Sequence, residues 1–126
     1  MDFPTNLKYT KDHEWVCMEG DTGMVGITEY AQGELGDVVF VVLPTIGKTV
    51  KKGESFGTVE AVKAVSDLYA PVSGEVVAVN TDLESKPELV NKEPYGGGWM
   101  IKLKLSDSGE LANLLDEKSY RELIGK

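Results

Sequence analysis

The chain has little of what most metal and redox sites are built from. Its 126 residues include one cysteine, Cys17, and one histidine, His13. A lone cysteine excludes an internal disulfide and a zinc cluster built from thiolates. A lone histidine, with no partner recognisable from spacing, provides neither a metal site nor a nucleophile–base pair. The sequence therefore disfavours a self-contained hydrolase or transferase, and we expect His13 to have a structural role.

Long apolar runs and an excess of basic residues are also missing. No apolar stretch approaches transmembrane length, and 21 acidic residues outnumber 13 basic ones, for a formal charge of −8. This balance disfavours nucleic acid and anionic membrane as partners. The N-terminal residues have the layout of neither a signal peptide nor a transit sequence. We therefore expect a complete cytoplasmic chain. The single cysteine fits a reducing compartment. Because Cys17 lies inside an expected strand, we expect it to be a buried structural thiol.

Short strands dominate what is present. Residues 15–18 and 24–27 flank a polar, glycine-containing turn and predict a hairpin, and Thr28 is the expected cap of a short helix over residues 29–32. The stretch Asp37–Leu43 is almost wholly apolar and β-branched, which is typical of a strand buried on both faces. Further strands are expected over residues 49–54, 55–62, 65–69, 75–80 and 99–105, and a turn or short helix over residues 81–91.

The C-terminal segment changes to helical spacing. Leu111, Leu114 and Leu115 recur at that spacing, Asp107 and Glu110 resemble a capping box, and a second short helix is expected around residues 120–124. The pattern predicts a small barrel or sandwich with peripheral helices. We expect one domain over residues 1–126, with a core over about 7–105 and a helical segment over about 107–124.

Lys63 lies between two expected strands and has apolar neighbours, Val62, Ala64 and Val65. As one of twelve lysines it would ordinarily be a surface charge. Its apolar setting favours a second interpretation, a lysine that carries a cofactor, because such a residue must project from the domain while rigid strands hold its base. Local turn rules do not predict a tight hairpin here, since no Gly, Asn or Asp occupies the tip.

Two acids, Glu14 and Asp67, occur in otherwise strand-rich stretches. Ordinary surface charge is the simpler interpretation of both. The alternative is that they meet a cationic group, because a nearby opposite charge stabilises a charged amine.

Several separated motifs, in the same order along the chain, resemble the H-protein family of the glycine cleavage system. They are Lys8–Val16, Val25–Gln32, Leu35–Val41, Phe56–Asn80, Leu89–Asn91, Pro94–Gly96 and Gly98–Met100. The resemblance runs from Leu7 to about Tyr120. It implies a mainly β fold, a flattened hybrid β-barrel or sandwich of the lipoyl type, with Lys63 on a hairpin tip carrying lipoate in amide linkage. The segment Val59–Ala64 is similar to the family's lipoylation motif, with Ala61 where many members have serine.

The resemblance implies a non-catalytic, monomeric carrier with four kinds of partner. A pyridoxal-phosphate-dependent glycine decarboxylase (P protein) loads the aminomethyl group, and a folate-dependent aminomethyltransferase (T protein) removes it. A dihydrolipoamide dehydrogenase (L protein) reoxidises the lipoyl dithiol, and lipoate-attaching enzymes modify Lys63. In the family the loaded arm folds back into a cleft where acidic and hydroxyl groups hold the amine. Glu14 and Asp67 match such positions, and Asp12 stands where some members have serine.

Three related carriers are the alternatives. Biotin-carrying domains share the architecture but place methionine on each side of the modified lysine, where this chain has Val62 and Ala64. A lipoyl domain of a 2-oxo-acid dehydrogenase would normally be followed by a linker and further domains. A protein that relays lipoate to other proteins would share the lysine, and the sequence does not distinguish it.

Overall fold

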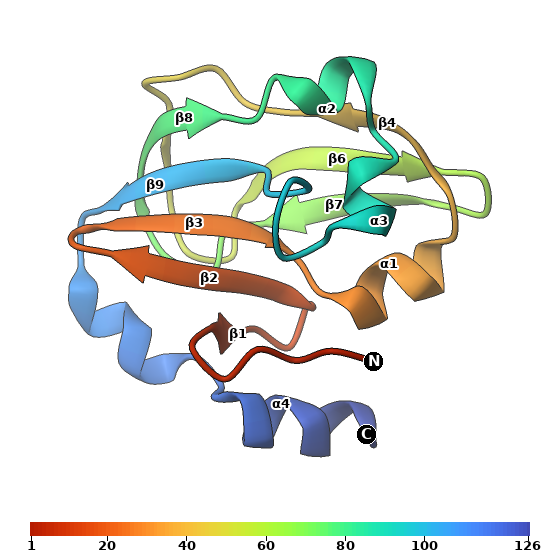
Figure 1. The fold of residues 1–126 in the computed structure, drawn as a ribbon. Coiled ribbons are helices and arrows are strands. Elements are labelled where there is room, and N and C mark those ends of the chain that lie inside the picture. The colour runs from red at the N-terminus through yellow and green to blue at the C-terminus, as the bar shows by residue number, and fades with distance from the viewer.

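The computed structural model describes all 126 residues and arranges the strands in two antiparallel sheets (Figure 1). The strand order is β1-β2-β3-β9-β8-β5 in the six-stranded sheet and β4-β6-β7 in the three-stranded sheet. The strands are β1 (Lys8–Tyr9), β2 (Glu14–Glu19), β3 (Thr22–Ile27), β4 (Val38–Val42), β5 (Thr49–Val50), β6 (Ser55–Ala61), β7 (Val65–Tyr69), β8 (Gly74–Val79) and β9 (Ile101–Leu105). The mainly β prediction is confirmed, and the pairing forms two separate sheets.

Short helices occupy the connections and the C-terminus. They are α1 (Glu29–Leu35), α2 (Asp82–Ser85), α3 (Leu89–Lys92), the 3₁₀ helix η1 (Ser108–Asn113) and α4 (Glu117–Ile124). Thr28 caps α1 as predicted, because its hydroxyl accepts a hydrogen bond from Ala31 N at 3.1 Å. No helix combines the length and apolar character that a membrane crossing requires.

The hairpin predicted after His13 is formed by β2 and β3. Their register runs from Glu14 opposite Ile27 to Glu19 opposite Thr22. Because side chains alternate between the two faces of a strand, this register sets Val16 and Val25 side by side on the core face, and both are buried.

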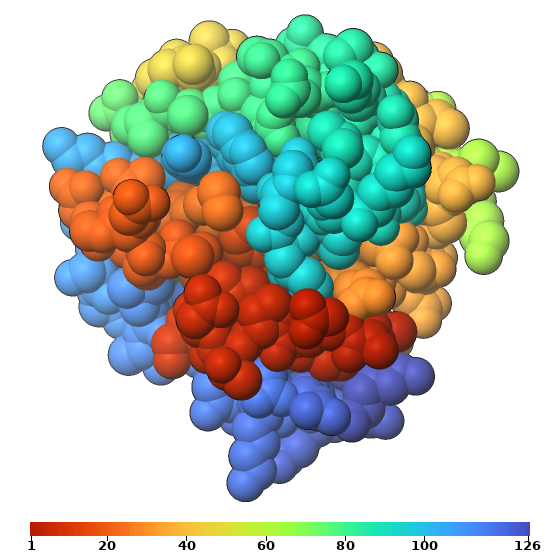
Figure 2. All heavy atoms as spheres, viewed as in Figure 1, coloured from red at the N-terminus to blue at the C-terminus, as the bar shows by residue number.

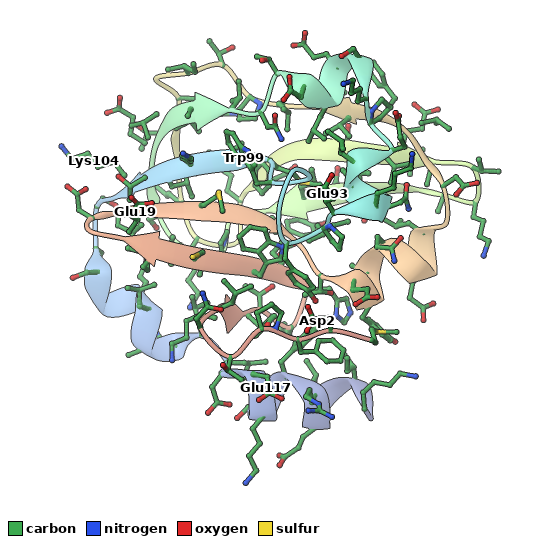
Figure 3. All side chains as sticks on the ribbon, viewed as in Figure 1. Asp2, Glu19, Glu93, Trp99, Lys104 and Glu117 are labelled. Atoms are coloured by element: carbon green, nitrogen blue, oxygen red, sulfur yellow. The ribbon has the colours of Figure 1, made fainter.

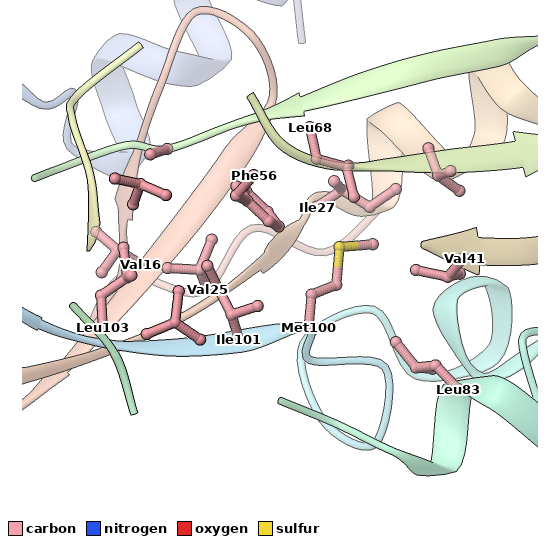
Figure 4. Packing of buried hydrophobic residues seen from close by; sticks show 14 of the residues in the cluster. Val16, Val25, Ile27, Val41, Phe56, Leu68, Leu83, Met100, Ile101 and Leu103 are labelled. Carbon is pink, nitrogen blue, oxygen red and sulfur yellow. The ribbon is translucent and has the colours of Figure 1, made fainter. Parts of the chain in front are cut away.

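The main core fills the space between the two sheets. Figure 4 shows Phe56 of β6 and Leu68 of β7 facing Val25, Ile101 and other residues of the larger sheet. A second buried cluster lies under α4 and consists of Phe3, Leu7, Tyr9, Trp15 and Tyr120. In the space-filling view, α4 and the N-terminal segment lie against each other at the lower edge of the molecule (Figure 2). The C-terminal helix is therefore joined to the N-terminal strands by its own aromatic cluster.

The prediction that residues 37–43 form a strand buried on both faces is wrong. Val38 and Val41 are buried, but Val39, Phe40 and Val42 are 50%, 52% and 47% exposed. The strand β4 is an edge strand of the smaller sheet, paired only with β6, and its register shifts between Val38 and Phe40. The core covers only one face of this sheet, so an apolar sequence pattern did not mean burial on both sides.

Two smaller predictions are also corrected. Cys17 is half-exposed rather than buried, because it points to the outer face of β2 beside Met24. Asp107 and Glu110 do not form a capping box: Asp107 accepts from Gly109 N, whereas the Glu110 carboxylate accepts from Ser73 N and Ser73 Oγ. Glu110 thus joins the 3₁₀ helix to the turn before β8, a tertiary contact that local spacing does not reveal.

Candidate functional site

Lys63 lies in the three-residue loop between β6 and β7, in a hairpin whose end projects beyond the rest of the fold (Figures 1 and 2). The loop is closed by a hydrogen bond from Ala61 N to the Ala64 carbonyl at 2.8 Å. None of its residues has a positive φ, so this turn needs no glycine or asparagine. The structure therefore has the hairpin that the family resemblance implied and local turn rules did not.

The Lys63 side chain passes over Gly36, which ends α1. Gly36 has a φ of 79°, and a Cβ built there would come within 3.3 Å of Lys63 Cδ and 3.4 Å of Cε. Glycine suits this position for both reasons, the left-handed backbone and the close approach. The contact places the outer methylenes of the lysine side chain, Cγ to Cε, at the C-terminal end of α1.

A cleft of about 200 Å³ lies between α1, β7 and the start of β2. Its apolar lining consists of Ile27, Ala31, Leu35, Val59 and Leu68, and its polar lining of Asp12, His13, Glu14, Glu34, Ser66 and Asp67. All three acids singled out from the sequence are in this lining. Lys63 does not line the cleft. Its side chain lies against the end of α1, and α1 forms one wall of the cleft.

Glu14 is the buried acid of the cleft. It is 3% exposed, its Oε1 accepts from Thr10 Oγ1 at 2.8 Å, and its Oε2 accepts from Tyr69 N at 3.4 Å. No Lys or Arg pairs with it. Burial raises the pKa of Glu14 to about 8, Asp12 adds to the rise, and the two hydrogen bonds oppose it. Burial thus favours the neutral carboxyl, and ordinary surface charge is the wrong interpretation of this residue.

Asp67 and Asp12 are exposed acids at the mouth of the same cleft. Asp67 comes from β7, opposite Thr58 of β6, and Asp12 from the turn before β2. With Glu14 and Glu34 they make a site of four carboxyl groups and no lysine or arginine. Such a site favours a small cation with an apolar attachment.

His13 forms the corner of the cleft beside Glu14. It is the only non-glycine residue with a positive φ, 71°, and its Nδ1 lies 2.9 Å from the Tyr120 hydroxyl. Burial lowers the pKa of the imidazole and favours the neutral ring, with Asp12 and Glu34 opposing that effect. A structural contact was predicted for His13, but its place in the cleft wall was not.

Sequence reasoning also missed Thr10 and Tyr120. Thr10 precedes Glu14 by four residues in the most specific N-terminal motif, and this spacing offered a usable signal. Tyr120 had no such signal, because it is 107 residues from its partner His13. Figure 3 shows the charged side chains of Glu19 and Lys104 projecting at one edge of the larger sheet. Glu14, by contrast, is 3% exposed.

A two-sheet β fold with a lysine at an exposed hairpin tip defines a class, the carrier domains of the lipoyl and biotinyl type. Comparison with known proteins specifies the class further. A sequence model described as Glycine cleavage H-protein matches residues 7–126.

Individual relatives agree with the family model. The chain is 56% identical over 124 residues to a glycine cleavage system H protein of Bacteroides fragilis, covering 98% of each chain. It is 61% identical over 117 residues to that of Symbiobacterium thermophilum, covering 93% of this chain and 91% of the relative. A crystal structure of a glycine cleavage system H protein from Mycobacterium marinum superposes with a TM-score of 0.90 at 43% identity, covering 98% of this chain and 100% of that one.

The chain belongs to the glycine cleavage H-protein family. It is a lipoate carrier of the glycine cleavage system and not one of the system's enzymes. The resemblance seen in the sequence is confirmed. Membership of the system implies that its other components are the partners of this chain.

Proposed function

We propose that Lys63 carries lipoate in amide linkage and that the chain shuttles an aminomethyl group and electrons between enzymes. The observation that carries this proposal is the position of Lys63: an exposed hairpin tip, closed by one backbone hydrogen bond and held by two strands. An enzyme can reach such an amine from several sides, and the rigid strands keep its base in place.

The residues present fit a lipoyl group. The Lys63 side chain starts along α1, and α1 leads to a cleft with five apolar lining residues. These apolar residues can cover the hydrocarbon chain and ring of the lipoyl-lysine arm. The four carboxyl groups of the cleft suit the cationic amine of its aminomethyl cargo. When bound, the lipoyl group would supply a disulfide, of which one sulfur takes up the aminomethyl group while the other becomes a thiol.

Glu14, Asp67 and Asp12 hold the amine of the cargo. A cationic amine beside Glu14 favours the ionised carboxylate and reverses the effect of burial on its pKa. Thr10 Oγ1 and Tyr69 N fix the carboxyl so that it does not swing away. The cargo is lost by hydrolysis, in which water breaks the carbon–sulfur bond and leaves a thiol, formaldehyde and ammonium. By keeping water from that bond, the cleft slows the loss.

The partners follow from this role. A pyridoxal-phosphate-dependent glycine decarboxylase loads the arm, a folate-dependent aminomethyltransferase unloads it, and dihydrolipoamide dehydrogenase reoxidises it. Lipoate-attaching enzymes modify Lys63 beforehand. We place the chain in the cytoplasm, as a monomer and as one domain over residues 1–126.

Intact mass tests the attachment site. The chain is coexpressed with a lipoate-attaching enzyme, together with the variants Lys63→Ala and Lys48→Ala, the second being an exposed lysine outside the hairpin. We expect one lipoyl adduct on the wild type and on Lys48→Ala, and none on Lys63→Ala. No adduct on the wild type, or a full adduct on Lys63→Ala, would overturn the proposal.

A further inference from the structure

A hydroxyl group from the far end of the chain reaches the wall of the cleft. Tyr120, in α4, is fully buried. Its hydroxyl lies 2.9 Å from His13 Nδ1 and 2.8 Å from Thr28 Oγ1, partners 107 and 92 residues away in the sequence. No other side chain of α4 makes a side-chain hydrogen bond outside its own helix.

The two partners of Tyr120 lie beside each other at the end of the β2–β3 pairing, and each leads into a different wall of the cleft. His13 is the corner that leads into Glu14, and Thr28 caps α1, which contributes Ala31, Glu34 and Leu35 to the lining. A backbone bond from Thr28 N to the His13 carbonyl, 3.0 Å, joins the same two walls. His13 is therefore joined to the start of α1 in two ways, by a backbone hydrogen bond and through the Tyr120 hydroxyl.

The corner needs such a connection because its backbone is in an unfavourable region. His13 has a φ of 71°, a region that is uncommon for non-glycine residues and that His, Asn and Asp enter more often than the others. Glu14 follows directly, so a change of conformation at His13 moves the carboxyl. The position of the amine-holding acid thus depends on what holds His13.

The ring of Tyr120 is itself rigidly seated. It stacks on Tyr9 with ring centroids 4.8 Å apart and 10° between the planes, and Phe3 meets it edge-on at 5.8 Å. Burial raises the pKa of Tyr120 to about 12, so the hydroxyl keeps its proton at neutral pH and can donate as well as accept.

We infer that Tyr120 is a positioning residue for cargo retention: its hydroxyl fixes the His13–Glu14 corner against α1 and so sets the geometry in which the amine is held. The C-terminal helix is then part of the cargo site, although it does not line the cleft. This inference rests on the proposed function of the cleft.

The experiment compares Tyr120→Phe with Tyr9→Phe in the lipoylated chain. Tyr9 is a matched control, because it belongs to the same cluster and its hydroxyl donates to the Pro4 carbonyl, away from the cleft. Both arms are loaded by the glycine decarboxylase, and formaldehyde release is followed after the decarboxylase is removed. We expect about five-fold faster release from Tyr120→Phe, as for one lost hydrogen bond, and the wild-type rate from Tyr9→Phe.

A second readout needs no cofactor. Proton NMR of the His13 ring in the unmodified chain is expected to show a changed titration midpoint in Tyr120→Phe and an unchanged one in Tyr9→Phe. Equal release rates and equal midpoints in the two variants would overturn the inference and leave Tyr120 with a packing role only. A wild type that acquires no lipoyl adduct would instead defeat the proposed function.

Thr28 provides a variant set in case Tyr120→Phe fails to fold. Thr28→Val keeps the volume but removes both the bond to Tyr120 and the bond that caps α1, whereas Thr28→Ser keeps the hydroxyl for both. Faster release from Thr28→Val than from Thr28→Ser, together with a His13 titration midpoint that changes in Thr28→Val only, supports the inference, because the cap bond to Ala31 N does not involve His13. Equal release from the two overturns it.

Discussion

Replacing Glu14 by glutamine should make the protein more stable and a poorer carrier. Glu14 is almost fully buried and has no cationic partner, so its ionised form is unfavourable in the empty cleft. Glutamine is neutral at every pH and nearly isosteric; its amide oxygen can accept from Tyr69 N while its NH2 group donates to Thr10 Oγ1. The substitution therefore removes the cost of ionisation and retains most of the packing.

The size of the effect follows from the pKa. Burial raises the pKa of Glu14 from 4.5 to about 8, so this residue favours folding fully below pH 4.5 and loses that contribution as the pH rises towards 8. Each pH unit in that interval lowers the free energy of unfolding by about 1.4 kcal/mol, so the loss at pH 7 is about 3 kcal/mol. For a chain of this length that difference corresponds to about 10 °C in Tm. The gain from Glu14→Gln should be small at pH 4.5, about 3 kcal/mol at pH 7, and larger at pH 8.

Urea unfolding at pH 4.5, 6, 7 and 8 measures this, with Glu19→Gln as the control. Glu19 ends the same strand but is exposed, so its replacement removes a carboxyl that burial does not affect. The loaded Glu14→Gln chain should also release formaldehyde faster, because the amine loses its buried anionic partner. A stability gain that does not grow between pH 4.5 and pH 8 would refute the reasoning, since Glu14 would then titrate as an ordinary carboxyl.

Two further predictions concern single residues. Asp67→Asn should leave lipoylation intact and change the free energy of unfolding by less than about 0.5 kcal/mol, because Asp67 is exposed. It should shorten the lifetime of the loaded arm several-fold, as measured by formaldehyde release. The control Asp82→Asn, on α2, should leave that lifetime unchanged. Gly98→Ala should cost more than about 2 kcal/mol in urea unfolding, because its Cβ would lie 2.6 Å from the Leu89 carbonyl oxygen. Gly33→Ala, on α1 with open space around it, should add up to about 1 kcal/mol, and a loss there would contradict the helix geometry.

Local chemistry predicted much of the fold. The glycine-containing turn between two β-prone runs predicted the β2–β3 hairpin, and Thr28 predicted the start of α1. These signals depend on turn conformation and on one capping hydrogen bond. Because both act over a few residues, they can be recognised in the sequence. The apolar neighbours of Lys63 likewise indicated a special lysine, and the order of the motifs indicated the family, which the comparisons confirmed.

The predictions of burial for β4 and Cys17 were wrong, because burial depends on whether another part of the chain covers that face of the strand. Every position of β4 is apolar, yet the core covers one face only, and the strand lies at a sheet edge. Cys17 was expected inside and lies half-exposed for the same reason. Alternation along a strand distinguishes its two faces, but which face is covered depends on segments distant in sequence.

The sequence by itself determined the family and the strand-rich fold and singled out Lys63, because those rest on short-range patterns and motif order. Only the tertiary structure decided that Glu14 is buried, since the strand that covers it includes Tyr69, 55 residues away. The structure also brought Tyr120 to His13 across 107 residues. Contacts at such separations depend on how the sheets and the C-terminal helix pack, and no local pattern records them.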